Sequence, residues 1–314
     1  MRYHQLLLLA LLLLAGSWVG CRRNETPASS GPTVALVMKT LNNPFFVDMQ
    51  RGAQQAAQKL GVNLLVQAAE REVDVEKQMQ IIENLIERKV DALCITPSGS
   101  KEIVPAIVKA NQAKIPVLIV DTRVDIPTLT AASGQILAFI GSDNVEGGRL
   151  AGRYLAERLG RQGKVAILEG IPGHETGDAR LRGFREVIAK EPGIQVVASQ
   201  TANWERDQGY SVFQNLLQSH PDLKGVFACN DLMALGAVEA IAAAQKTGQV
   251  LVVGFDATSD ARQAIRAGTM AGSVAQPPED MGRLAVENAV AALRGQTIPK
   301  EVPVAVELIT KDKL

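Results

Sequence analysis

The chain has 314 residues, which is enough to bury a large core and is near twice the length of a typical domain, so two domains are expected. The 33 Lys and Arg residues balance the 33 Asp and Glu residues, which excludes a charge field that recruits nucleic acid or an anionic membrane surface. Three histidines and three cysteines without zinc spacing give no sign of a metal site, a cofactor or a disulfide framework. The expected partner is therefore small or neutral.

The N-terminus reads as a processing segment. Arg2 supplies a positive start, and the apolar run 6–15 is too short to span a bilayer, so we predict an export signal over residues 1–20. Cleavage can fall after Ser17 or before Cys21, which would then be lipidated. The polar stretch 21–32 has the composition of a tether. We predict a lipoprotein in the periplasm or on the outer face of the cell membrane, although Trp18 stands where a bacterial lipobox usually has Leu.

From residue 34 onward, short apolar runs alternate with amphipathic ones, which is typical of parallel strands covered on both faces by helices. A first series of strands is predicted at 34–38, 63–66, 92–95, 117–120 and 138–140. A second series is predicted at 164–168, 196–198, 225–228, 251–253 and 272–274. The fold class is therefore α/β, with two similar lobes that each contain a parallel sheet flanked by helices.

The helices between the strands carry apolar stripes at helical spacing. One stripe ends at Gly61 and contains Met49, Ala53, Ala56, Ala57 and Leu60. A second contains Val75, Met79, Ile82 and Ile86. Both stripes are expected to pack against a sheet.

The first strand runs into the segment 39–46, where a helix is expected to begin. Asn43 can cap that helix, and Pro44 suits its first turn. Two adjacent aromatics, Phe45 and Phe46, are not both expected in the core. Beside Lys39 they combine an apolar face with hydrogen-bonding groups, which suits a sugar site.

Further polar side chains follow the other strands. In open α/β sheets, ligands bind beyond the carboxyl ends of the strands. The residues at these ends are mostly planar groups, namely Asp121, Arg123, Asn230, Asp231, Asp256 and Gln276. Sugar hydroxyls both donate and accept, so paired planar groups and a stacking aromatic such as Trp204 fit them. Taken singly, Asn43 can be only a cap, Asp121 a turn residue and Trp204 an anchor to the core.

Enzyme motifs are missing where this architecture would place them, because no glycine-rich phosphate loop follows the first strand. His174 has no second histidine beside it in the sequence and is expected in a solvated loop. A glycosidase would need two carboxylates, and Asp121 and Asp256 show no feature that raises either pKa. We therefore predict a binding protein and not an enzyme.

Five motifs carry a family resemblance: KTLNNPFF at 39–46, ASQ at 198–200, NDLMALG at 230–236, VVGFD at 252–256 and VAQ at 274–276. Together they resemble the periplasmic sugar-binding proteins of bacterial ABC importers, in the ribose- and allose-binding branch with the type I periplasmic binding fold. The resemblance covers about 33–310. It implies an N-terminal lobe of 33–142 plus 276–306 and a C-terminal lobe of 143–275 plus 307–314, joined by a multi-strand hinge. A sugar-responsive repressor shares this fold but would have a DNA-binding segment where this chain has its export signal.

The resemblance also implies the site. The sugar contacts would be Lys39, Asn43, Asp121, Arg180, Asn230, Asp256 and Gln276, with Phe45, Phe46 and Trp204 stacking on the ring. Lys39 and the segment 177–180 are similar to the allose binder. Where the ribose binder has an arginine after the aspartate, this chain has Thr122 and then Arg123, so the sugar stays open.

The implied function is a monomeric receptor that captures a neutral allose-like hexose or ribose-like sugar and delivers it to a membrane ABC permease. A receptor for a nucleoside or a furanose signal is the alternative, and a further role with a chemoreceptor is left open.

Overall fold

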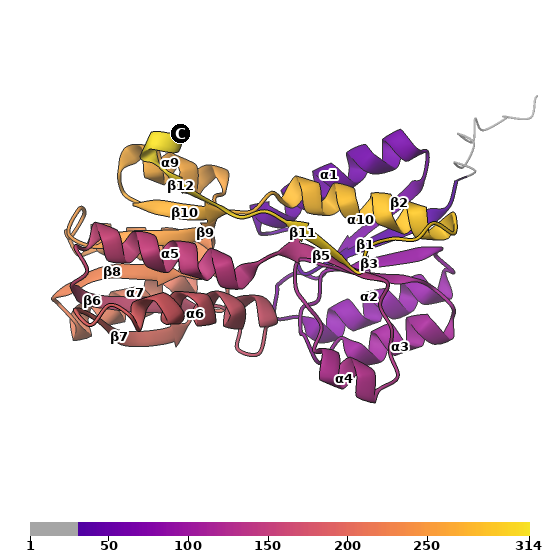
Figure 1. Ribbon diagram of the computed structural model, residues 1–314, viewed down its shortest axis with the longest axis horizontal. Helices are drawn as coiled ribbons and strands as arrows, with labels where there is room; N and C mark the ends of the chain where they lie inside the picture. Colours follow the sequence, from indigo (N-terminus) through magenta and orange to yellow (C-terminus); the bar gives the residue numbers. More distant parts are fainter. Residues whose placement is uncertain (1–30) are drawn as a thin grey trace, which may run out of the picture. The chain divides into compact units, whose positions relative to one another are not determined.

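Two six-stranded sheets, each with its own covering helices, make up the part of the chain that the structure describes, residues 31–314 (Figure 1). The structure is a computed structural model. The predicted export signal, Cys21 and nearly all of the predicted tether lie outside the described residues. Within 31–314, every helix is too short or too polar to traverse a lipid bilayer.

The N-terminal sheet has the strand order β11-β5-β4-β3-β1-β2, and all of its neighbouring strands are parallel. Its strands are β1 (Thr33–Met38), β2 (Asn63–Ala68), β3 (Ala92–Ile95), β4 (Val117–Val120), β5 (Ala138–Ser142) and β11 (Glu301–Val304). Its helices are α1 (Pro44–Leu60), α2 (Val75–Glu87), α3 (Val104–Gln112), α4 (Ile126–Ala131) and α10 (Pro278–Leu293).

Both faces of this sheet are buried, as the apolar strands predict. Val34, Leu36 and Met38 of β1 pack in one core cluster with α1 and α10. Ala35 and Val37 point the other way and pack with α2 and α3. This alternation follows from the two-residue period of a strand. The apolar stripe predicted on α1 is accordingly a core face. On α2 the buried face is Gln78, Ile81, Ile82 and Leu85, so of the predicted stripe only Ile82 is fully buried, while Met79 and Ile86 pack partly buried against the core.

The C-terminal sheet has the order β12-β10-β9-β8-β6-β7. Its strands are β6 (Gly163–Glu169), β7 (Ile194–Thr201), β8 (Leu223–Ala228), β9 (Leu251–Asp256), β10 (Gly272–Ala275) and β12 (Glu307–Thr310). Its helices are α5 (Asn144–Arg158), α6 (Glu175–Ile188), α7 (Arg206–Ser219), α8 (Asp231–Ala243) and α9 (Ser259–Ala267), and a short 3-10 helix, η1 (Lys311–Lys313), ends the chain. Helix α5 packs beside α6, and α7 packs beside α8.

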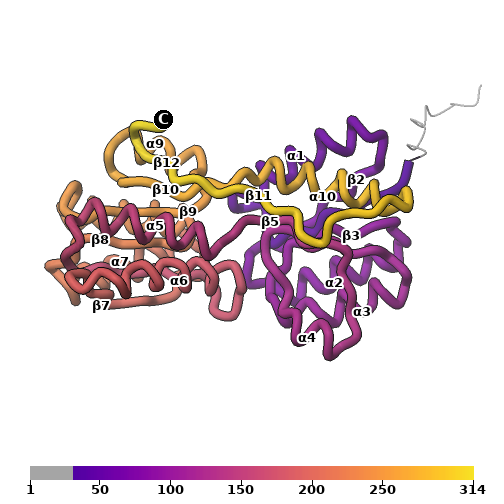
Figure 2. Tube along the Cα trace, viewed as in Figure 1, coloured from indigo at the N-terminus to yellow at the C-terminus, as the bar shows by residue number. Residues whose placement is uncertain are grey.

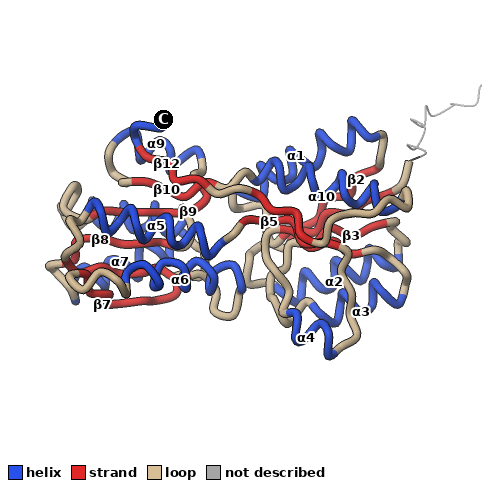
Figure 3. Tube along the Cα trace, viewed as in Figure 1, coloured by secondary structure: helices blue, strands red, loops and turns tan. Residues whose placement is uncertain are grey.

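The chain passes between the two sheets three times, after β5, after β10 and between β11 and β12. The tube in Figure 2 shows the yellow C-terminal segment running back from one lobe to the other, and Figure 3 shows strands on both sides of that crossing. The predicted α/β fold of two lobes with parallel sheets and flanking helices is confirmed. The lobe boundaries taken from the resemblance stay a prediction.

All ten predicted strands are present, and most are longer at their ends than predicted. Strands β11 and β12 were not predicted. Both are four residues long, β11 contains Pro303, and β12 pairs antiparallel with β10 in an otherwise parallel sheet. Edge strands of this kind lack the continuous apolar run that marks a buried parallel strand.

Candidate functional site

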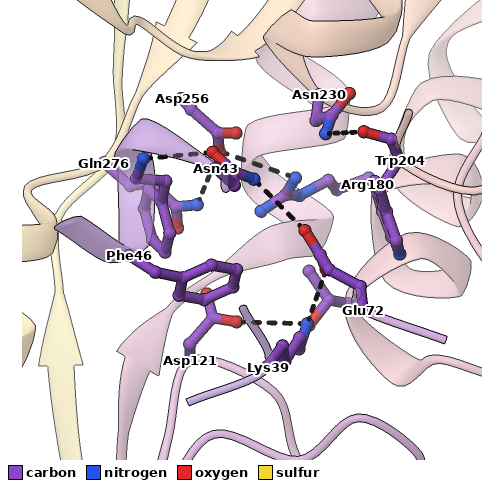
Figure 4. Close-up of a pocket in the computed structure, with 12 residues that line it drawn as sticks. Lys39, Asn43, Phe46, Glu72, Asp121, Arg180, Trp204, Asn230, Asp256 and Gln276 are labelled. Carbon is purple, nitrogen blue, oxygen red and sulfur yellow. Dashed lines mark hydrogen bonds and ion pairs between the residues drawn. The ribbon is translucent and has the colours of Figure 1, made fainter. Parts of the chain in front are cut away.

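A small cavity of about 20 Å³ lies between the carboxyl ends of the two sheets (Figure 4). It is lined by Lys39, Asn43, Phe45, Phe46, Glu72, Asp121, Thr176, Arg180, Trp204, Asn230, Asp256 and Gln276. The structure thus brings all ten predicted site residues to one place. Sequence reasoning missed Glu72 and Thr176.

Lys39 and Asn43 enter the cavity from the turn between β1 and α1. Asn43 caps α1, because its Oδ1 accepts a hydrogen bond from the Phe45 backbone N–H at 3.0 Å. Its Nδ2 still donates to Glu72 Oε1 at 3.2 Å. Asn43 is therefore both a cap and a cavity residue, so the two interpretations of it are compatible.

Lys39 lies between two carboxylates. Its Nζ is 3.6 Å from Glu72 Oε2 and 3.6 Å from Asp121 Oδ2, and the lysine side chain is only 3% exposed. Burial raises the pKa of Glu72, while the charge of Lys39 opposes that rise. The lysine and its two carboxylates form a buried charged cluster on the N-terminal side of the cavity.

Glu72 was missed because the second strand was predicted to end two residues too early. The sequence suggested that the second strand ended at residue 66, but β2 continues to Ala68. Glu72 then follows the carboxyl end of β2 closely, as the other lining residues follow their strands. It is 5% exposed, and nothing in the surrounding run of polar residues distinguishes it from a solvated glutamate.

Arg180 enters from α6 and is held rigidly. Its Nε donates to Asn144 Oδ1 at 2.9 Å, and its Nη1 donates to the Cys229 carbonyl at 2.6 Å. The guanidinium lies 3.6 Å from the Phe255 ring centroid, and its Nη1 is 3.7 Å from Asp256 Oδ1. A guanidinium fixed in this way presents its remaining N–H groups in one orientation.

Asp256 and Gln276 form a pair at the ends of β9 and β10. Gln276 Nε2 donates to Asp256 Oδ1 at 2.9 Å, and Gln276 Oε1 is buried with no partner within residues 31–314. Burial raises the pKa of Asp256 well above its usual range, and the nearby Arg180 charge opposes that rise. An unpaired buried acceptor beside a carboxylate is suited to bind hydroxyl donors.

The aromatic residues differ from the expectation in one respect. Phe45 and Phe46 were not both expected in the core, but both are buried and pack with the N-terminal core cluster while they also line the cavity. Their rings meet edge to face, with centroids 5.2 Å apart. The first turn of α1 lies against the sheet and the cavity at once, so one ring can serve both.

Trp204 is also buried, at 3% exposure, and lies against glycines. A methyl group at Gly170 would lie 1.9 Å from the indole ring, and one at Gly177 would lie 3.2 Å from it. The Arg180 guanidinium is 5.8 Å from the indole centroid. Trp204 therefore packs in the C-terminal core and borders the cavity, so the anchor interpretation and the site interpretation both apply.

Backbone strain gathers at this site. Asp121, Trp204 and Asp256 have φ values of 64°, 68° and 109°, although none of them is glycine. Such residues cost free energy and persist where the surroundings hold them, often at binding sites.

Asn230 lines the cavity, and both polar atoms of its side chain already form hydrogen bonds within the protein. Its Oδ1 accepts from the Met233 N–H and so caps α8, and its Nδ2 donates to the Trp204 carbonyl. Asp231, the next residue, is fully buried behind the cavity, where it accepts two hydrogen bonds from the protein.

Arg123 and His174 differ from what the sequence suggested. Arg123 points away from the cavity, pairs with Glu301 at 2.8 Å and stacks 3.7 Å above the Phe139 ring. The expectation of a solvated His174 was wrong, because this side chain is 3% exposed and accepts a long hydrogen bond from Trp204 Nε1. Burial lowers the pKa of His174 to about 3, so the imidazole is neutral. The indole above it, which the sequence does not link to residue 174, shields it from water.

The two lobes touch each other beside the cavity. The Thr122 and Thr176 hydroxyls are 2.9 Å apart, and the Glu175 backbone N–H donates to Ser100 Oγ at 3.1 Å. Thr122 thus occupies the place next to Asp121 and contributes to the contact between lobes. The described structure is a closed arrangement of the two lobes.

Neither of the described cysteines, Cys94 and Cys229, lines the cavity. Cys94 and Cys229 are buried thiols whose burial raises their pKa to about 12, so they stay protonated. Within residues 31–314, no group of three or more His, Cys, Asp or Glu side chains is arranged to hold a metal ion.

Comparison with known proteins agrees with this geometry. A family model described as a periplasmic binding protein domain matches residues 34–297. The ribose import binding protein of Salmonella typhimurium is 41% identical over 284 residues, which cover 90% of this chain and 92% of that protein. The D-allose-binding periplasmic protein of Escherichia coli is 37% identical over 291 residues, covering 92% and 93%.

A solved structure gives the same picture. The crystal structure of an ABC transporter periplasmic solute binding protein from Actinobacillus succinogenes with bound D-allose superposes with a TM-score of 0.85. It is 39% identical in sequence, and the match covers 90% of this chain and 98% of that one. The chain therefore belongs to the periplasmic binding protein family, among the ribose- and allose-binding proteins of ABC importers that its sequence resembles.

Proposed function

We propose that this protein is an exported receptor that captures a neutral monosaccharide, an allose-like hexose or a ribose-like sugar, between its two lobes and delivers it to an ABC permease. The observation that carries the proposal is the interlobe cavity, which joins aromatic walls to paired planar polar groups. Relatives named for ribose and allose support a sugar over other small ligands.

The charges in the cavity favour an uncharged ligand rich in hydroxyl donors. Two cations, Lys39 and Arg180, face three carboxylates, Glu72, Asp121 and Asp256. Burial raises the pKa of both Glu72 and Asp256, so the site approaches neutrality when one of them holds a proton. The negative charge of a phosphorylated or acidic sugar would be repelled by this excess of carboxylates. A neutral sugar would meet acceptors for its hydroxyl protons.

The ligand would act by stabilising the closed arrangement. Lining residues come from both lobes, so only closed lobes can contact the sugar from both sides at once. The direct contacts between lobes at Thr122–Thr176 and Ser100–Glu175 would form in the same movement. The surface that the two lobes form together in the closed arrangement would then be the one that the permease recognises.

Catalysis is not part of the proposal, since the family consists of solute-binding proteins. A glycosidase acid would need a carboxylic proton aimed at a leaving group. Here the Asp121 carboxylate is engaged with Lys39 and accepts from the Thr122 hydroxyl at 2.9 Å. Burial raises the pKa of Asp256, contrary to the expectation from the sequence, but this side chain is engaged with Gln276 and Arg180.

The family is periplasmic, and we propose in addition that Cys21 anchors this member to the membrane by a lipid. Residue 21 follows an apolar signal core and precedes a polar tether. Cys21→Ser should move the protein from the membrane fraction to the soluble fraction. If wild type and Cys21→Ser were both found in the soluble fraction, the proposal of a lipid anchor would be refuted.

A thermal-shift screen of pentoses, hexoses, nucleosides and furanoses tests the proposed ligand class. A neutral monosaccharide at 100 times its Kd should stabilise the protein by about 2.7 kcal/mol. Sugar phosphates and uronic acids serve as charged controls and should have no effect. Stabilisation by a nucleoside and by none of the sugars would overturn the proposal.

A further inference from the structure

The turn that carries Asp256 into the cavity is strained. Strand β9 ends at Asp256 with φ at 109°, and Ala257 follows with φ at 49°. Residues with a Cβ are disfavoured in this region of backbone space, so two in succession need support from their surroundings. Without such support the turn would relax and the Asp256 carboxylate would move.

A buried pair of side chains holds this turn. The Ala257 N–H donates to Ser273 Oγ at 3.0 Å, and the Ser273 hydroxyl donates to Asp231 Oδ1 at 2.6 Å. The Thr258 N–H donates to Asp231 Oδ2 at 2.7 Å. Ser273 and Asp231 are both completely buried, and they come from β10 and the start of α8. Two successive N–H groups of the turn are thus fixed, one directly and one through a hydroxyl.

The surrounding sequence makes room for this pair. Gly254 lies beside Ser273 in the sheet, and a Cβ at position 254 would lie 2.3 Å from Asp231 Oδ1. A buried carboxylate is costly, and here both of its oxygens accept hydrogen bonds from the protein. Asp231 is fully buried and does not line the cavity, so its hydrogen bonds serve the turn.

We infer that Asp231 and Ser273 are positioning residues of the sugar site: they hold the left-handed turn at Asp256 and Ala257 and so aim the Asp256 carboxylate at the ligand. The inference rests on the proposed function for its effect on binding. Its structural half, the hold on the turn, does not depend on any ligand.

The structural half is tested by hydrogen exchange in the sugar-free protein. Ser273→Ala removes the acceptor of the Ala257 N–H and one donor to Asp231. We expect the amides of residues 257 and 258 to exchange at least about tenfold faster, while the amides of β8 stay protected. The control is Ser211→Ala, whose exposed hydroxyl donates only to the Asp207 carbonyl in its own helix. Unchanged exchange at 257 and 258 in Ser273→Ala would overturn the inference.

The binding half is tested by calorimetry with the best sugar from the screen. Ser273→Ala should bind roughly tenfold or more weakly than wild type, and Ser211→Ala should bind as wild type does. Adding Ala257→Gly should recover part of the loss, because glycine adopts positive φ without a steric penalty. A melting temperature for each variant shows that the folded protein is being titrated.

The outcomes separate the two proposals. If wild type binds no sugar, the proposed function fails, while the exchange data still decide whether the pair holds the turn. If wild type binds and Ser273→Ala binds equally well, the positioning role fails and the function stands. A loss of affinity that Ala257→Gly does not recover would also overturn the role, because the strained turn would then not be its cause.

Discussion

At the scale of single residues, Lys39 is the side chain whose surroundings say most about ligand size. Its ammonium group lies between Glu72 and Asp121 and 5.7 Å from the Phe46 ring centroid. A serine at position 39 would leave empty the space that the lysine side chain fills, so a hexose would lose contacts there. It would also remove the ammonium group as a hydrogen-bond donor.

Lys39→Ser should therefore lose affinity for the preferred hexose by about tenfold more than for a pentose. The substitution also leaves two carboxylates without their cation, so the double variant Lys39→Ser/Glu72→Gln serves as its control. Calorimetry with both sugar classes measures the ratio. Equal losses for pentose and hexose in both variants would refute a role in ligand size.

Substitution of Gly170 gives a second test at this scale, because a methyl group at this position would overlap the Trp204 indole. Gly170→Ala should displace the ring, weaken sugar binding by about tenfold and shift the tryptophan emission. Trp204→Phe gives the control, since its smaller ring leaves room for the methyl group. Gly170→Ala should cost little affinity when added to Trp204→Phe, and a full loss in that background would show that the indole is not the target.

The residue scale is also where sequence reasoning did best. All ten predicted site residues line one cavity, and their contact with a sugar stays a prediction. Most of them were found because the carboxyl ends of parallel strands meet at one place, whereas Arg180 came from the family resemblance. Arg123 shows the limit of the rule, since successive residues of a turn point in different directions. Glu72 and Thr176 were missed because their burial arises from the meeting of distant segments.

At the scale of elements, the start of α6 combines several roles. His174 occupies the cap position, Glu175 and Thr176 contact the opposite lobe, and Arg180 follows one turn later. The sequence predicted only Arg180 from this segment, through its resemblance. The indole of Trp204 and the opposite lobe bury this polar segment, and neither leaves a periodic signal in the sequence. The prediction of a solvated His174 was wrong for this reason.

The buried imidazole gives this element a pH dependence with a definite sign. The folded protein holds His174 neutral to about pH 3, whereas the unfolded chain protonates it near its ordinary pKa of about 6.5. The unfolded state then binds more protons, so the free energy of unfolding contributed by this residue falls as the pH drops below about 6.5.

The test compares urea unfolding of wild type and His174→Asn between pH 7 and pH 4. The variant should lose less stability than wild type on acidification, by roughly 1 kcal/mol per pH unit. Buried carboxyls titrate in both proteins, so their contribution cancels in the difference. A difference that does not change with pH would mean that His174 is solvated after all.

At the scale of the whole described chain, function depends on the meeting of two lobes. The alternation of apolar and amphipathic runs predicted two α/β lobes, because buried parallel strands need helices on both faces. The three crossings between the lobes could not be read from that alternation. The family resemblance implied a hinge of several strands but not their number, and β11 and β12 are short edge strands without a strong pattern.

The central claim is that a sugar binds between the lobes through Asp256, and calorimetric titration of wild type and Asp256→Ala with the best sugar tests it most directly. Hydrogen bonds to a charged group contribute roughly 1.5 to 3 kcal/mol each, so losing two should weaken binding several hundredfold or more. Asp260→Ala, on an exposed residue of the adjacent helix, should bind as wild type does. Saturable binding by wild type with none measurable in Asp256→Ala is the predicted result, and near-native affinity in Asp256→Ala would contradict the account.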